Sequence, residues 1–220
     1  MKLDLHIHSY YSPDSLSQPK NIIKTAIKNK IDIISITDHN TILGGLSTYQ
    51  ENKKNKTDLL TVIGSEIHTD VGDIIGLFLN SEIKSRKIAE VLDEITDQDG
   101  ITILPHPFKN HNLEILNKFM NKIEFIELLN SRSPITKDEI IQIHSYNKKE
   151  LGSSDAHFTF EIGKCYTLLN IPFKPNSNDS LISAIRKYPL KAEGTFSNPF
   201  IQKSSQLIKI INQYRKNSSK

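Results

Sequence analysis

Short apolar runs of strand type recur along this chain, and nearly every one is followed by histidine or carboxylate side chains. The first run carries His6 and His8, which stand two residues apart and therefore project from the same face of a strand. The residues that follow the later runs are Asp38, His39, Glu66, His106, Asp155 and His157. Because reactive groups gather beyond the carboxyl ends of strands in parallel α/β folds, the pattern predicts one shared site.

The apolar runs alternate with segments of helical periodicity, such as Ile22, Ile23, Ala26 and Ile27 after Pro19. The predicted strands are residues 3–7, 31–36, 59–63, 74–79, 101–104, 123–129, 151–153 and 165–168. The first predicted helix begins near residue 19, and the others cover residues 43–52, 88–97, 113–121, 137–146 and 181–187. Seven or eight strands that alternate with helices favour a parallel sheet closed into an α/β barrel.

The expected organisation is one barrel domain over residues 1–195, followed by a C-terminal helix and flexible tail over residues 196–220. Disorder is expected from Lys216 to the end of the chain. The apolar residues of this last segment are expected to pack on the barrel in preference to a neighbouring molecule. They are Leu207, Ile208, Ile210 and Ile211.

Composition excludes several classes of protein. The net charge of +3, from 28 basic and 25 acidic residues, is too small to indicate a nucleic-acid scaffold. Cys165 is the only cysteine, which excludes an internal disulfide and a thiolate metal cluster, so any metal ligands are nitrogen or oxygen atoms. No apolar run approaches the roughly 20 residues that span a bilayer, and the first residues form a strand in place of a signal peptide. We therefore expect a cytoplasmic protein without a membrane or stable protein partner.

Imidazole and carboxylate ligands suit Zn²⁺, Mn²⁺ or Fe²⁺. The candidate ligands are His6, His8, Asp14, His39, Glu66, His106, Asp155 and His157. These are too many for one ion and predict two or three divalent metals, with Glu66 as the candidate bridge. Two neighbouring metals activate water for an in-line displacement at phosphorus. Asp14 could instead be a turn residue or helix cap, and Asp38 could ligate metal directly or orient the imidazoles.

Six motifs occur in the order D-L-H-I-H-S, S-P-D-S, T-D-H-N, G-S-E-I, L-P-H-P and S-S-D-A-H. Over residues 4–157 they resemble the PHP (polymerase and histidinol phosphatase) family of metal-dependent phosphoesterases. The resemblance implies a distorted seven-stranded β/α barrel with two or three metals at the carboxyl ends of its strands. It implies a first metal at His6, His8, Glu66 and Asp155, a second at Glu66 and His106, and a third at Asp14, His39 and His157.

The chain departs from the family pattern at one strand. Trinuclear members place another histidine after the strand that ends at Asn130, where this chain continues with Ser131 and Arg132. Two metals are therefore as compatible with the sequence as three. Asn130 and Arg132 are interpreted as substrate contacts, since the planar guanidinium suits two phosphate oxygens. Asp38 or a histidine near the metals is a candidate proton donor to the leaving oxygen.

The sequence thus predicts a metal-dependent phosphoesterase acting on a small phosphorylated substrate, either a phosphomonoester or a short phosphodiester. Nucleotide or oligonucleotide fragments are favoured, with histidinol phosphate second. One alternative is an amidohydrolase-like enzyme for C–N bonds, because those barrels also begin with H-x-H. Such enzymes usually need a metal-bridging lysine or paired histidines on later strands, whereas here Glu66 is the candidate bridge. The other alternative is a non-catalytic metal-stabilised module that binds a partner through its basic tail, residues 203–220.

Overall fold

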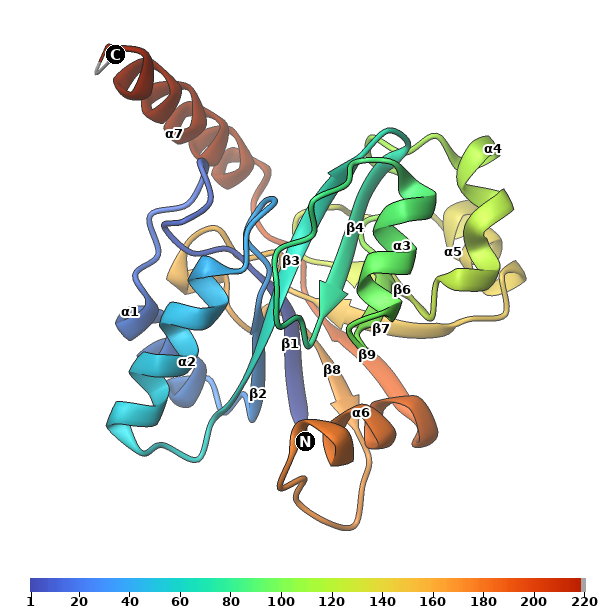
Figure 1. Cartoon of the computed structure of the whole chain (residues 1–220), viewed down its shortest axis with the longest axis horizontal. Helices are drawn as coiled ribbons and strands as arrows, with labels where there is room; N and C mark the ends of the chain where they lie inside the picture. Colours follow the sequence, from blue (N-terminus) through green and yellow to red (C-terminus); the bar gives the residue numbers. More distant parts are fainter. Residues whose placement is uncertain (219–220) are drawn as a thin grey trace.

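The computed structural model describes residues 1–218, in which nine strands form one strongly curled sheet (Figure 1). The strand order is β7-β6-β5-β4-β3-β2-β1-β8-β9. The strands are β1 Lys2–Ile7, β2 Ile33–Ile36, β3 Leu60–Thr69, β4 Gly72–Leu77, β5 Ile101–Leu104, β6 Phe125–Asn130, β7 Lys149–Ser153, β8 Cys165–Leu169 and β9 Leu190–Gly194. The predicted α/β barrel is therefore present, and it is nearly closed.

The barrel closes where the edge strand β7 approaches β8 and the other edge strand, β9. The Thr167 hydroxyl on β8 accepts a hydrogen bond from the backbone N–H of Gly152 on β7 and donates one to its carbonyl oxygen, both over 2.9 Å. A Cβ atom at Gly152 would lie 2.6 Å from the carbonyl oxygen of Tyr166, which explains why glycine occupies this point of closest approach.

The expectation of seven strands in a parallel sheet is wrong in two respects. The sheet has nine strands, and it is mixed: β4, β8 and β9 run antiparallel to their neighbours. Only Asp70 and Val71 separate β3 from β4, and parallel pairing would need a crossover of a dozen or more residues. The unpredicted strand β9 has the weakly apolar sequence LKAEG and is held as a strand by its pairing with β8.

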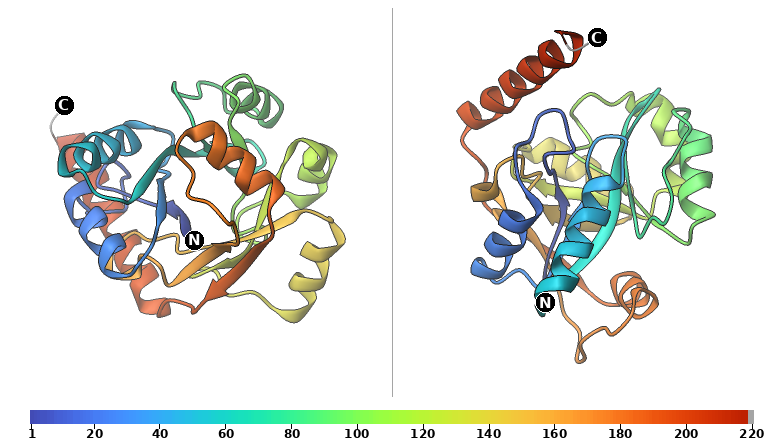
Figure 2. Two further views of the ribbon diagram at one scale, coloured as in Figure 1. Left: turned by 90° about the horizontal axis from the view of Figure 1, so that it is seen from below. Right: turned by 60° about the vertical axis from the view of Figure 1, so that its left-hand side comes forward.

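Helices lie on the outer side of the sheet and at one of its ends (Figures 1 and 2). They are α1 Pro19–Lys28, α2 Leu43–Asn55, α3 Ile88–Thr96, α4 Leu113–Leu116, α5 Lys137–Ser145 and α6 Asn178–Lys187, with 3₁₀ turns η1 Asn117–Lys122 and η2 Thr159–Glu161. The helix expected over residues 113–121 is split between α4 and η1. Helix α6 closes the end where β1 begins, since Leu181 and Ile185 pack with Leu3 and Leu5 of β1.

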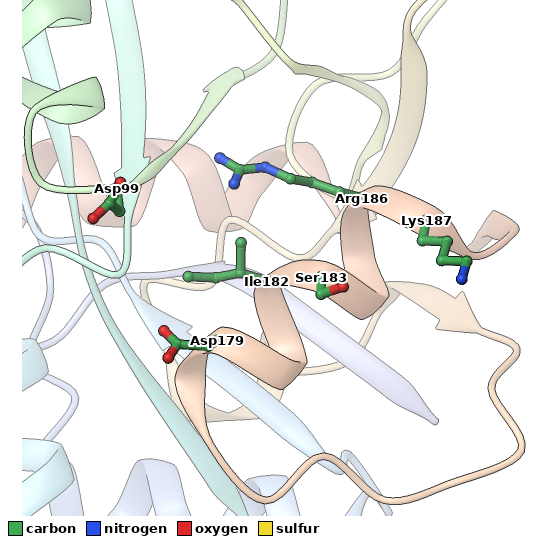
Figure 3. Close-up of a pocket in the computed structure, with 6 residues that line it drawn as sticks. All are labelled: Asp99, Asp179, Ile182, Ser183, Arg186 and Lys187. Carbon is green, nitrogen blue, oxygen red and sulfur yellow. The ribbon is translucent and has the colours of Figure 1, made fainter.

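A surface hollow of about 480 Å³ lies beside α6, at the end of the barrel where β1 begins (Figure 3). Its charged lining side chains are exposed. One of them, Arg186, forms an ion pair with Glu124, in which Nε lies 2.6 Å from Oε2. The lining residues are Asp99, Asp179, Ile182, Ser183, Arg186 and Lys187.

The C-terminal helix α7, Pro199–Ser218, extends beyond the barrel at the opposite end from α6 (Figure 1). Helix α7 reaches Ser218, residues 219–220 lie outside the described residues, and the flexible tail expected from Lys216 stays a prediction. The expected packing of apolar residues on the barrel is wrong for Leu207, Ile210 and Ile211, which are 57%, 48% and 42% exposed. Polar residues of α7 contact the barrel instead: Ser205 meets Arg132, and Asn212 donates to the carbonyl oxygen of Pro13. Within residues 1–218, no helix has the length and apolarity required to cross a bilayer.

Candidate metal centre

The predicted ligands are brought together at the ends of strands. His6 lies in β1 and Glu66 in β3, whereas His39 follows β2 and His106 follows β5. The register between β1 and β2 shifts between Asp4 and Ile7. This irregularity changes which residues of β1 point into the barrel: Leu3 and Leu5 do so near α6, and His6 and His8 do so at the site. Backbone bridges from His39 to Glu66 and from Ile7 to Ala156 hold the loops beside the strands.

All eight predicted ligands lie in this cluster. Their candidate ligand atoms form three overlapping groups, within each of which the atoms lie within 4.8 Å of one another. The groups are His8, Asp14, His39 and His157; His6, Glu66 and His106; and His6, His8 and Asp155. Because His6 and His8 each belong to two groups, the geometry joins neighbouring ion positions in one polynuclear arrangement.

Hydrogen bonds on the far side of the imidazoles orient their Nε2 atoms toward the cluster. Nδ1 of His6 donates to the Glu127 carboxylate at 2.9 Å, and Nδ1 of His157 donates to the carbonyl oxygen of Asp155 at 2.9 Å. Nδ1 of His8 lies 3.1 Å from the Ser12 hydroxyl. For His6 and His157, a donor Nδ1 leaves Nε2 with its lone pair in the neutral ring, which is the tautomer that a metal ligand requires.

The Glu66 carboxylate has the position of a bridge. Its Oε1 lies 3.0 Å from Nε2 of His106, whereas its Oε2 lies 3.0 Å from Nδ1 of His39 and 3.4 Å from Nε2 of His8. The two oxygens therefore face different groups of imidazoles. One carboxylate in this arrangement can bind two ions at once.

Two aspartates complete the ligand cluster. Oδ2 of Asp14 lies 3.2 Å from Nε2 of His39, and Oδ1 of Asp14 is buried without a hydrogen-bond partner among the described residues. Oδ1 of Asp155 lies 3.3 Å from Nε2 of His8. Asp155 and His106 both have positive φ, at +53° and +29°, which is costly for residues with a Cβ atom and is a form of strain that occurs at functional sites.

The ionisation of these groups reflects their burial and their mutual attraction. Burial disfavours the charged form of His6, but the charges of Asp155, Glu127 and Glu66 outweigh it and hold the pKa of His6 well above its usual value. Burial likewise opposes ionisation of Glu66, but His39 and His6 hold its pKa well below the ordinary range. His8 differs: burial and the nearby His157 lower its pKa to about 3. In the absence of metal, protonated imidazoles therefore balance the charge of the carboxylates, and bound divalent cations would replace those protons.

The donor set fits divalent metal ions. The ligand atoms are imidazole nitrogens and carboxylate oxygens. The Nδ1 atoms of His6, His8 and His157 are hydrogen-bonded to Glu127, Ser12 and the Asp155 backbone, respectively. One buried carboxylate oxygen of Asp14 has no protein partner among the described residues. Zn²⁺, Mn²⁺ and Fe²⁺ all accept such a set. His6, Asp14 and Glu66 would hold ions in different parts of the cluster.

Asp38 and Asn130 lie behind the ligands. Both oxygens of the Asp38 carboxylate accept hydrogen bonds from Ser9, one from the backbone N–H at 2.7 Å and one from the hydroxyl at 2.6 Å. The amide nitrogen of Asn130 donates to Glu127 at 2.9 Å and to Asp155 at 3.4 Å. Neither residue is among those lining the cavity at the site. Their geometry suits positioning of ligands better than the proton transfer or substrate contact expected from the sequence.

Arg132 lines the cavity, as expected of a substrate contact, but its guanidinium also has protein partners. Nη1 lies 3.2 Å from the buried carboxylate of Glu161, and Nη2 donates to the hydroxyl of Ser205 on α7. Glu161 in turn accepts from the backbone N–H of His157 at 3.1 Å. Arg132 therefore compensates a buried charge and connects α7 to the loop that carries His157.

Glu127 is a site residue that the sequence interpretation missed. Its side chain is 1% exposed, and its Oε2 accepts from the backbone N–H of His106 at 3.0 Å while its Oε1 accepts from His6. One signal was available: a lone carboxylate stands in the middle of the otherwise apolar run FIELL. A buried charge in a strand needs a partner, so it points toward a polar site.

The cavity at the site has a volume of about 490 Å³. It reaches the ligands Asp14, His39, Glu66, His106, Asp155 and His157 and extends outward to residues from several further segments. These outer residues include His68 and Asp73 of the β3–β4 hairpin, Lys109 and Asn110 in the loop after β5, and Ser205, Gln206 and Lys209 of α7. A volume of this size lies in the range of small-molecule sites.

The chain belongs to the PHP domain family, whose model matches residues 4–165. Among curated relatives, the uncharacterized protein MJ1587 of Methanocaldococcus jannaschii is 46% identical over 119 residues, which cover 49% of this chain and 68% of that protein. The family assignment agrees with the resemblance seen in the six sequence motifs.

Solved structures show the same fold at low sequence identity. A two-domain protein of Bacteroides vulgatus that contains a predicted PHP-like metal-dependent phosphoesterase has a TM-score of 0.71 and 21% identity, covering 89% of this chain and 65% of its own. The lesion-specific endonuclease PfuEndoQ of Pyrococcus furiosus has a TM-score of 0.63 and 16% identity, covering 90% of this chain and 59% of its own. This chain thus spans about two thirds or less of each of these proteins.

Proposed function

We propose that this protein is a metal-dependent phosphoesterase that hydrolyses a phosphomonoester or short phosphodiester in a nucleotide or oligonucleotide fragment. The observation that carries the proposal is Glu66, whose two oxygens face His106 on one side and His39 and His8 on the other. Adjacent ions bridged by one carboxylate suit in-line displacement at phosphorus, where attacking and leaving oxygens both carry charge.

The residues of the chain have distinct roles in this proposal. Bound divalent metals would supply Lewis-acid polarisation of the phosphoryl group and acidify water. Glu127 holds the proton on Nδ1 of His6, and the Asp155 carbonyl does the same for His157, so both Nε2 atoms stay available as ligands. The burial of His6, His8 and Glu66 keeps bulk water from these atoms, and electrostatic interactions strengthen accordingly.

Two observations favour a nucleotide or oligonucleotide as the substrate class. Lysine side chains line the outer part of the cavity, where they would attract an anionic substrate. The fold is also that of PfuEndoQ, which is described as a lesion-specific endonuclease. An amidohydrolase-like reaction is less well supported, because the side chain placed to bridge two ions is the carboxylate of Glu66 and not a lysine.

The test is the release of phosphate from a panel of phosphomonoesters, and of phosphate or mononucleotides from short oligonucleotides, with Mn²⁺ or Zn²⁺ added. The native chain is compared with His8→Ala, which removes a ligand, and with His144→Ala. His144 is a matched control because it is exposed on α5 and pairs with Glu150 away from the cluster. We expect metal-dependent release that is lost in His8→Ala and retained in His144→Ala.

Two results would contradict the proposal. One is equal phosphate release by the native chain and His8→Ala. The other is no release from any substrate by protein shown to hold at least two metals, together with turnover of amides, which would favour C–N bond hydrolysis. Bound metal without turnover of either class would indicate a binding module.

A further inference from the structure

Helix α7 contributes a polar face to the cavity although it lies far from the ligands in sequence. Ser205, Gln206 and Lys209 line the cavity and are spaced as neighbours on one side of a helix. The apolar Leu207 and Ile211 of the same helix are exposed. The helix thus turns hydrophilic side chains toward the site and apolar ones toward solvent, the reverse of the orientation that packing alone would select.

Contacts at two points hold α7 over the cavity. Ser205 accepts a hydrogen bond from Nη2 of Arg132, and Asn212 donates to the carbonyl oxygen of Pro13 at 2.9 Å. Pro13 precedes the ligand Asp14, so α7 bears directly on the loop that delivers a metal ligand. Lys209 lies between these two contacts along the helix.

The second lysine at the cavity, Lys109, is carried by an anchored loop. Its backbone N–H donates to the carbonyl oxygen of His106 at 2.9 Å, which forms a tight turn directly after that ligand. Further along, Nε2 of His111 donates to the carbonyl oxygen of Asp73 at 2.9 Å, and Asn112 donates to Val71. Lys109 lines the same cavity as the ligands His106 and Asp155.

The two lysines carry positive charge that a single phosphate bound at the metals would not need for its neutralisation. Among the described residues, neither Lys109 nor Lys209 has an ion-pair partner, and Asp73, the outer carboxylate of the cavity, pairs with His68 at 2.8 Å. A phosphoryl group bound at the ligand cluster would already be neutralised by the divalent ions. An anionic group farther out along the substrate would find these two ammonium groups available.

We propose that Lys109 and Lys209 form a subsite for a second anionic group of the substrate. The protein thereby selects phosphoesters with an additional backbone phosphate over isolated phosphomonoesters. This inference rests on the proposed phosphoesterase function and deepens it, because it assigns the substrate class to an oligonucleotide end. In this proposal, Lys209 of α7 and Lys109 of the loop after β5 select the substrate, whereas the metal ligands at the strand ends support its hydrolysis.

The test compares thymidine 5′-monophosphate with the 5′-phosphorylated thymidine dinucleotide, which carries one further phosphodiester. The kcat/KM for phosphate release is measured for the native chain, Lys209→Ala, Lys109→Ala and Lys203→Ala. Lys203 is a matched control on the same helix, since it is exposed and does not line the cavity. The native chain is expected to prefer the dinucleotide. Lys209→Ala and Lys109→Ala should each reduce that preference about tenfold, as expected for loss of one charged contact, whereas Lys203→Ala leaves it unchanged.

The outcomes separate the subsite from the phosphoesterase function. Equal losses on both substrates in Lys209→Ala would overturn the subsite and indicate a structural role for α7. If the native chain releases no phosphate from either substrate and no mononucleotide from the dinucleotide, the proposed function fails, and equilibrium binding of a fluorescently labelled 5′-phosphorylated dinucleotide then decides the subsite. Weaker binding by Lys209→Ala than by Lys203→Ala supports it in that case, and equal binding contradicts it.

Discussion

Two hollows of nearly equal volume lie at opposite ends of the barrel, about 490 Å³ at the ligand cluster and about 480 Å³ beside α6. They differ in how deeply their charged side chains are buried. Glu66, Asp155 and His106 are 1%, 2% and 5% exposed, whereas the charged residues of the α6 hollow are all exposed. Burial of ionisable groups is costly unless they are paired or bind metal. The volume of a hollow therefore says little here, and convergent buried charge identifies the site.

The largest expected effect tests the role of Glu66. Glu66→Gln keeps the shape of the side chain but replaces one ligand oxygen with an NH₂ group that cannot bind metal. Loss of the bridge should reduce metal-dependent phosphate release by about a thousandfold, equivalent to the several kcal/mol that metal stabilisation provides. Metal content by mass spectrometry and the rate of release check it. Near-native activity would show that the two oxygens do not serve two ions.

A smaller effect is expected one layer behind the ligands. In Glu127→Gln, the amide NH₂ would face either Nδ1–H of His6, at the position of Oε1, or the N–H groups of His106 and Asn130, at the position of Oε2. In either orientation a donor meets a donor, so His6 or the backbone of His106 loses its support, and metal affinity should fall about 10- to 100-fold. Competition with a chelator measures the affinity. Glu124→Gln is the matched control at the other end, where the carboxylate pairs with exposed Arg186, and it should leave metal affinity unchanged.

The buried cluster should also make metal affinity depend on pH. Opposing charges hold the pKa of His6 and His39 well above the usual value, so both imidazoles are protonated at neutral pH in the metal-free protein. Metal binding must release those protons, and the affinity rises with pH by about tenfold per unit for each proton displaced. Calorimetry in buffers of different ionisation enthalpy measures the proton release. A pH-independent affinity would contradict the assignment of these imidazoles as ligands.

The smallest effect is expected at the α6 hollow. Arg186→Ala removes the pair with Glu124, in which the two side chains are 43% and 32% exposed. An exposed pair of this kind contributes about 0–1 kcal/mol to the free energy of unfolding. Urea denaturation measures that change, and phosphate release should equal that of the native chain. A loss of activity without a loss of stability would assign this hollow a functional role and contradict the view that buried charge marks the functional end of the barrel.

Local sequence patterns predicted much of the fold and most of the site. Alternating apolar runs predicted strands and helices close to their observed positions, and the motif order predicted the eight residues that the structure brings together. Ligands after strands are readable because parallel strands end at a common edge. The strand β9 was not predicted, because its pairing with β8 stabilises a segment whose own pattern is weak.

The roles of Arg132 and Asp38 show where such reasoning ends. Arg132 reads as a phosphate contact, yet the structure pairs it with Glu161 and Ser205, which are 29 and 73 residues away along the chain. Asp38 stands beside His39 in sequence, yet its carboxylate binds Ser9. Neighbours in sequence need not share a site, because successive side chains of an extended chain point to opposite faces.

Local residue patterns were enough to predict the alternation of strands and helices, the nitrogen and oxygen character of the metal ligands, and the order in which the strands carry them. These properties follow from periodicity and residue type, which are local. Three features could not be predicted in this way: which strands run antiparallel, the contact by which Glu127 orients His6, and the position of Lys209 of α7 at the cavity. Those features depend on contacts between distant residues, and such contacts form only where packing and charge compensation of the whole barrel permit them.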